Sequence, residues 1–108
     1  MGALLALAVA ASGLHGIVSR GPIQPVCRAG TPCTAPAVGA MLVFSRNGRV
    51  AARVRTLAGG RYTVRLAAGT YAVRLSPVPR IGGLTPRTVR VPGGASRRVD
   101  FTIDTGIR

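Results

Sequence analysis

The sequence lacks several residue types on which common chemistries depend. Its 108 residues include no glutamate, no lysine and no tryptophan, and its only acidic residues are Asp100 and Asp104. The single histidine, His15, leaves few groups for general acid–base catalysis or for a metal site, which needs about four ligands. We therefore expect no enzymatic activity, no cofactor and no bound metal.

A small hydrolase is the one catalytic alternative that the inventory allows. Its nucleophile, base and orienting acid would have to be a serine, His15 and either Asp100 or Asp104. The two aspartates lie four strand positions apart, about 13 Å at the usual rise, so they do not form a catalytic carboxylate pair. This alternative ranks below a binding protein.

Negative charge is scarce, whereas arginine is abundant. Arginine supplies all 15 basic residues, and the formal net charge is +13. A hydrophobic content of 47% excludes a disordered basic tail, and the length suits one domain. A GC-rich genome would explain arginine in place of lysine but not the near absence of acids. Such a charge attracts polyanions, which leaves a nucleic-acid-binding protein as the alternative binding function.

The N-terminus contains a short uncharged run. Residues 3–11 are Ala, Leu and Val, and Ser12 and Gly13 follow, as in the apolar region and cleavage site of a secretory signal. The run is too short to span a bilayer. Only two residues precede it, which leaves open whether Met1 is the natural start. We predict a signal peptide at 1–13, a mature domain at 14–108 without a membrane span, and a secreted or cell-envelope location.

The only cysteines are Cys27 and Cys33. An even count in an exported protein predicts one local disulfide, closing a loop within a Pro- and Gly-rich segment. Two free buried cysteines remain the alternative for a cytosolic protein.

Gly and Pro interrupt the chain every 8 to 15 residues, and the stretches between them alternate with period two. This pattern predicts an all-β fold, a seven-stranded antiparallel sandwich of the immunoglobulin or prealbumin type. The predicted strands are 15–20, 38–45, 49–56, 61–66, 70–76, 86–91 and 97–104. The residues predicted to face the core are Val50, Ala52, Val54, Tyr62, Val64, Leu66, Tyr71, Val73, Leu75, Val99, Phe101 and Ile103.

Arginines of these strands occupy the alternate positions, which are predicted to face away from the core.

Asn47-Gly48 predicts a tight hairpin turn. A second hairpin, between 49–56 and 61–66, would place Arg55 opposite Arg61, an unfavourable pair unless the two share an anion. If these strands share a sheet, their outward-facing arginines form a basic stripe, which we expect to bind anionic polymers. The members of this stripe are Arg53, Arg55, Arg61, Arg65 and Arg74.

Several motifs resemble a known family. Residues 60–73 have the form G-x-Y-x-V-x-L-x-x-G-x-Y-x-V, and residues 47–54 and 88–94 match the neighbouring strand patterns. They resemble carboxypeptidase regulatory-like domains, small exported β-sandwiches similar to transthyretin and to the B-type repeats of collagen adhesins. The cysteine pair and the chain ending resemble a small secreted bacterial subgroup.

The resemblance implies a prealbumin-like, carbohydrate-binding-like fold without an active site, acting as an accessory or binding module of the cell envelope. The partner would be an envelope component or an anionic polymer. We expect no specific nucleic-acid partner, because Phe44, Tyr62, Tyr71 and Phe101 mostly occupy inward positions and would not form a stacking platform.

Overall fold

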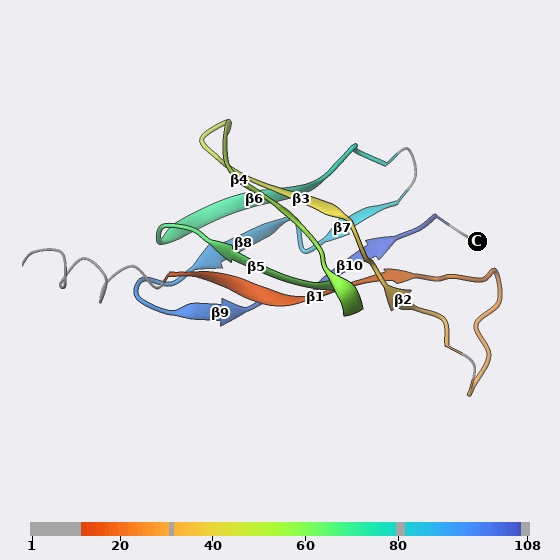
Figure 1. The fold of residues 1–108 in the computed structure, drawn as a ribbon. Coiled ribbons are helices and arrows are strands. Elements are labelled where there is room, and N and C mark those ends of the chain that lie inside the picture. The colour runs from red at the N-terminus through yellow and green to blue at the C-terminus, as the bar shows by residue number, and fades with distance from the viewer. Residues whose placement is uncertain (1–11, 31, 80–81, 107–108) are drawn as a thin grey trace, which may run out of the picture.

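The computed structural model describes residues 12–30, 32–79 and 82–106, which form two β-sheets (Figure 1). The predicted all-β class is confirmed. In chain order the elements are β1 (Gly13–Gly21), β2 (Ala35–Pro36), β3 (Met41–Arg46), β4 (Arg49–Arg55), the 3₁₀ turn η1 (Ala58–Gly60), β5 (Arg61–Arg65), β6 (Gly69–Ser76), β7 (Gly83–Thr85), β8 (Thr88–Val91), β9 (Ser96–Arg98) and β10 (Phe101–Asp104).

The first sheet has four antiparallel strands in the order β4-β3-β6-β8. Strands β3 and β4 are joined by the predicted Asn47-Gly48 turn, where both residues adopt positive φ. Because Asn and Gly tolerate this conformation, the turn reverses the chain within two residues. We call this the β3 sheet, because β3 is an inner strand that pairs along most of its length with β4 and with β6.

The second sheet is built around β1. On one edge, β1 pairs with β5 and then with β2, both antiparallel. On the other edge it pairs in parallel with β9 and then β10, and β7 continues the sheet beyond β10. We call this the β1 sheet.

Inner faces of both sheets enclose one core. Phe44 of the β3 sheet makes an edge contact with Phe101 of the β1 sheet, with ring centroids 6.3 Å apart, and Tyr62 packs against Phe101 at 5.6 Å. The predicted core residues that are buried are Tyr62, Val64, Leu66, Tyr71, Val73, Leu75 and Phe101, and those partly buried against them are Ala52, Val54, Val99 and Ile103. Of the positions that alternation assigned to the core, all but one face it. The core also contains residues that were not assigned, namely Leu14, Val18, Ala37, Leu42, Phe44, Leu84, Val89 and Val91.

The exception is Val50, which is 41% exposed. Phe44 lies opposite Ala52, but Ser45 lies opposite Val50, so Ala51 is an extra residue in β4. Such a β-bulge reverses the parity of the strand beyond it and turns Val50 outward.

The predicted strand count and purely antiparallel arrangement were wrong. The described residues contain ten strands, including the short β2 and β7, and the predicted strand 97–104 is divided into β9 and β10. Parallel pairing of β1 with both of these strands makes the sheet mixed. Pairing between opposite ends of the chain needs no local crossover helix, so the spacing of neighbouring strands did not reveal it.

The predicted hairpin between 49–56 and 61–66 was also wrong, because β4 belongs to the β3 sheet and β5 to the β1 sheet. The chain changes sheets at Thr56, a buried residue. Its hydroxyl donates to the carbonyl of Ala37 and accepts the N–H of Ala40. Arg55 and Arg61 are therefore not cross-strand partners.

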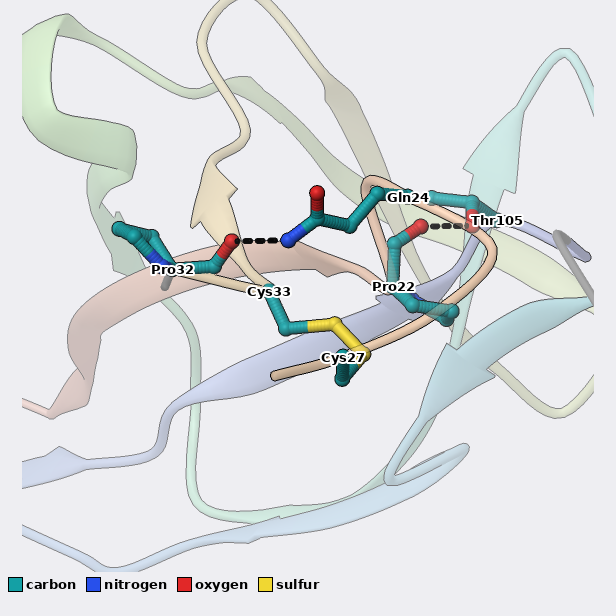
Figure 2. Close-up of a disulfide and its surroundings, with 6 residues drawn as sticks. All are labelled: Pro22, Gln24, Cys27, Pro32, Cys33 and Thr105. Atoms are coloured by element: carbon teal, nitrogen blue, oxygen red, sulfur yellow. Dashed lines mark hydrogen bonds between the residues drawn. A yellow bond between two sulfur atoms is a disulfide. The ribbon is translucent and has the colours of Figure 1, made fainter. Parts of the chain in front are cut away.

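A long loop between β1 and β2 carries the disulfide, which joins Cys27 and Cys33 with their Cα atoms 5.5 Å apart (Figure 2). Near the bond, the Gln24 side chain donates to the carbonyl of Pro32. At the base of the loop, Thr105 donates to the carbonyl of Pro22. The predicted pairing is confirmed, and the loop is attached to the sheet beside β10.

Most of the predicted signal segment lies outside the described residues. Ser12 and Gly13 are described, and both engage the fold: the Ser12 hydroxyl donates to the Leu66 carbonyl, and Gly13 lies opposite Arg65 and Ser96 in the β1 sheet. No described helix is long and apolar enough to cross a membrane.

Candidate functional site

Arginine side chains gather on the outer face of the β3 sheet. Along β4 and β6 the inward positions are apolar, so the alternate positions Arg53, Arg55 and Arg74 point away from the core and are exposed. Arg90 of β8 lies opposite the outward-facing Thr70 and joins the same face. We call these four residues the arginine face.

Two of these arginines border a buried valine. Val43 lies directly opposite Arg53 on one side and Arg74 on the other, so the three residues form one row across the sheet. The two arginine Cα atoms are about 10 Å apart at the usual strand spacing. Val43 is only 1% exposed although it is on the outer face, because the aliphatic stems of neighbouring long side chains cover such positions while their charged ends reach water.

The guanidinium groups of this face differ in how they are held. Arg55 donates to the carbonyl of Gly39 at 2.8 Å, which fixes it beside the start of β3. Among the described contacts, no hydrogen bond or ion pair engages the side chains of Arg53 and Arg74. Both therefore have all five donors directed to solvent or to a ligand.

Neither aspartate of the chain lies in the β3 sheet. Asp104 belongs to β10, and Asp100 lies between β9 and β10, where it pairs with Arg98 at 3.3 Å. The arginine face thus has no carboxylate on its own sheet to neutralise it. The resulting positive potential attracts polyanions.

The predicted basic stripe is divided between two faces. Arg61 and Arg65 extend from β5 on the outer face of the β1 sheet, away from Arg53, Arg55 and Arg74. The expectation that all five line one sheet was wrong, because η1 and the residues before it carry the chain from one sheet to the other. Arg90 was not among the predicted residues but belongs to the arginine face, and its exposed alternate position in the strand Thr88–Val91 could have indicated this.

Of the serine, histidine and aspartate that a hydrolase would need, the structure places only the serine and the histidine in contact. The Nδ1 atom of His15 lies 2.7 Å from the hydroxyl of Ser96. No described hydrogen bond joins His15 to a carboxylate, because Asp100 accepts the N–H of Ile17 and pairs with Arg98, while Asp104 accepts the N–H of Gly106. The arrangement is a serine–histidine pair without the orienting acid of a triad.

The aromatic residues lie away from the arginines. Phe44, Tyr62, Tyr71 and Phe101 are each 3% exposed or less, and alternation had assigned the last three of them to the core. Bases of single-stranded nucleic acid stack on exposed aromatic rings, and the arginine face offers none of these four. Within the described part of the chain, no three His, Cys, Asp or Glu residues are grouped as a metal site.

Comparison with known protein families and with curated proteins found no match to this chain.

Proposed function

We propose that this protein is an exported, non-catalytic binding module of the cell envelope whose arginine face binds anionic polymers. The observation that carries this proposal is the cluster of Arg53, Arg55, Arg74 and Arg90 on a sheet without either aspartate. Guanidinium suits such a role because its planar fork meets phosphate, sulfate or carboxylate with two parallel hydrogen bonds.

Edge protection does not account for the whole face. Charged residues on an edge strand discourage pairing with other chains, and this explains Arg53 and Arg55 on β4. Arg74, in contrast, lies on β6, an inner strand that pairs with β3 on one side and, through Gly69–Ala72, with β8 on the other. A charge on an inner strand is not needed to protect an edge, so it favours ligand binding.

The disulfide and the architecture support the location and the family. A bonded Cys27–Cys33 pair is typical of proteins from oxidising compartments. The two-sheet all-β fold is compatible with a carboxypeptidase regulatory-like, prealbumin-like domain, the family that the sequence motifs resemble. We propose membership of that family on the motifs and the sheet architecture together.

The binding test compares two variants that remove the same charge. Arg53→Gln/Arg74→Gln alters the arginine face, whereas Arg61→Gln/Arg65→Gln alters the opposite face. Binding of fluorescent long-chain polyphosphate is measured from about 50 to 200 mM salt, a range over which counterion release makes affinity fall steeply. We expect the first variant to flatten the log–log salt slope by about 2 and the second to leave it nearly unchanged.

Equal changes in the salt slope for the two variants would mean that polyphosphate responds only to net charge, and the assignment to the arginine face would be wrong. No salt dependence in the unmodified protein would remove the electrostatic mechanism altogether. Thermal unfolding of both variants serves as the control for folding. Export is tested separately by fractionating native cells, and a purely cytoplasmic protein would overturn the envelope location.

A further inference from the structure

A second surface feature lies on the opposite side of the molecule from the arginine face. A pocket of about 220 Å³ opens on the outer face of the β1 sheet. Its walls come from three adjacent strands: His15 and Ile17 of β1, Arg61, Tyr62 and Thr63 of β5, and Arg98 of β9. Pockets that enclose drug-sized ligands measure roughly 300–1,000 Å³, so this one suits a small molecule or the end group of a larger one.

Pairing places the polar walls in fixed rows. Thr63 and Arg98 lie on either side of His15, and Arg61 lies opposite Ile17 in the next row. The His15 ring is held by Ser96 through Nδ1, which leaves Nε2 as its remaining polar atom. Strand positions, rather than a flexible loop, therefore set the spacing of these groups.

The strand that pairs in parallel with β1 is interrupted at Val99 and Asp100, between β9 and β10. This break positions the charged side chains of Arg98 and Asp100 on this side of β1. β1 pairs with β9 and with β10 in the same register. At the break between them, the N–H of Ile17 donates to the carboxylate of Asp100 at 2.9 Å instead of to a backbone carbonyl. Gly16 allows this close approach, because a Cβ there would lie 2.7 Å from the same carboxylate oxygen. Asp100 in turn pairs with Arg98.

The charge balance of the pocket differs from that of the arginine face. Asp100 offsets the charge of Arg98, whereas no described hydrogen bond or ion pair engages the guanidinium of Arg61. One uncompensated positive charge favours one negative charge on the ligand. The fork of Arg61 and the hydroxyl of Thr63 can both donate to a carboxylate, which accepts up to four hydrogen bonds.

The pocket also has an apolar wall, to which Ile17 contributes. The ring of Tyr62 packs against Phe101 in the core and its hydroxyl donates to the carbonyl of Val99, so Tyr62 offers no polar group to a ligand. A ligand made only of charged and polar groups would leave this surface without a partner, whereas a compact hydrocarbon body would cover it. We propose that this pocket is a binding site for a small organic monoanion, a carboxylate on a compact apolar body, with Arg61 as the anchoring charge.

His15 is the only histidine in the chain and provides a reporter inside the pocket. Its ring resonances are followed by NMR while benzoate is added to the intact protein at constant pH and ionic strength. Benzamide has the same ring without the charge, and sulfate has the charge without the ring. We expect a saturable shift with benzoate at millimolar concentration, and much weaker responses to benzamide and sulfate.

Matched variants locate the anchor. Arg61→Gln should weaken benzoate binding by about tenfold or more, as expected for the loss of a charge-assisted hydrogen bond. Arg65→Gln removes the same charge from the same face of β5, outside the pocket, and should leave binding unchanged. Thr63→Val, which should weaken binding a few-fold, provides a second test if Arg61→Gln does not fold.

Equal weakening by Arg61→Gln and Arg65→Gln would overturn the proposal, because it would mean that the ligand responds to general charge. Benzamide or sulfate binding as tightly as benzoate would overturn the assignment of the ligand class. A non-saturating shift would remove the site. Arg53→Gln/Arg74→Gln should not alter benzoate binding, so this result is independent of polymer binding.

Discussion

Tyr62 links the core to the break between β9 and β10. Its ring packs against Phe101, and its hydroxyl donates to the carbonyl of Val99, next to the residue where the strand is interrupted. Burial, and secondarily the negative charge of Asp100, raises the pKa of the Tyr62 phenol. The folded state therefore favours the neutral phenol.

This preference has a consequence for stability at alkaline pH. Above about pH 10 the phenol of Tyr62 ionises in the unfolded chain, whereas the folded protein retains its proton. The unfolded state then binds fewer protons, so the free energy of unfolding falls as the pH rises. We expect the urea midpoint of the unmodified protein to drop between about pH 8 and about pH 11. Tyr62→Phe should show a smaller drop, and an equal drop in both proteins would contradict this account.

At neutral pH the same variant measures the hydrogen bond. Tyr62→Phe leaves the Val99 carbonyl without this donor, and we expect a loss of about 1–3 kcal/mol in the free energy of unfolding. Arg65→Ala, at an exposed position on the outer face of the same strand, should change stability by less than about 0.5 kcal/mol. If the two variants were equally stable, the hydroxyl would not have the partner that we assign to it.

At the level of elements, the approach of β9 and β10 to β1 depends on Gly16. A Cβ at this position would overlap the carbonyl oxygen of Val99. We expect Gly16→Ala to lower the free energy of unfolding by about 1–3 kcal/mol or more, the usual cost of an overpacked site. The control is Gly93→Ala, where the added Cβ would meet only the Ala68 Cβ at 3.8 Å. Similar urea midpoints for the two variants would show that β1 tolerates a side chain at this point.

The disulfide loop is a second element whose contribution can be measured. Replacing Cys27 and Cys33 by serine should cost about 2 kcal/mol, because a short closed loop removes little entropy from the unfolded chain. Contacts such as Thr105 to Pro22 should keep the base of the loop attached. Intact mass before and after reduction should differ by about two daltons in protein from an oxidising compartment. An unchanged mass, with both thiols open to alkylation, would contradict the pairing.

On the scale of the whole molecule, Phe101 connects the two sheets. It is 1% exposed and contacts Phe44 from the facing sheet and Tyr62 from its own. Phe101→Ala should cost about 3–5 kcal/mol, a large part of the stability of a domain this size. Far-UV circular dichroism during thermal unfolding tests this, and an unchanged melting temperature would mean that the sheets do not depend on this contact. Val43→Ala, at a buried position outside the shared core, should be less costly.

The sequence by itself determined the class of fold and most inward positions. Alternation with period two is a local property, so Tyr71, Val73 and Leu75 could be assigned to the core without knowledge of their partners. The Asn47-Gly48 turn and the disulfide were also predictable, because each depends on residues close together in the chain. The same alternation failed at Val50, where a bulge changed the parity of one strand.

Only the tertiary structure decided which strands share a sheet. Parity shows that Arg53 and Arg61 both face outward, but it carries no information on whether they point to the same side of the molecule. Pairing of β1 with β9, more than 80 residues away, likewise brought His15 to Ser96. Contacts between distant segments arise from packing of the whole chain. The arginine face and the pocket around Arg61 therefore appeared only once the two sheets were assembled.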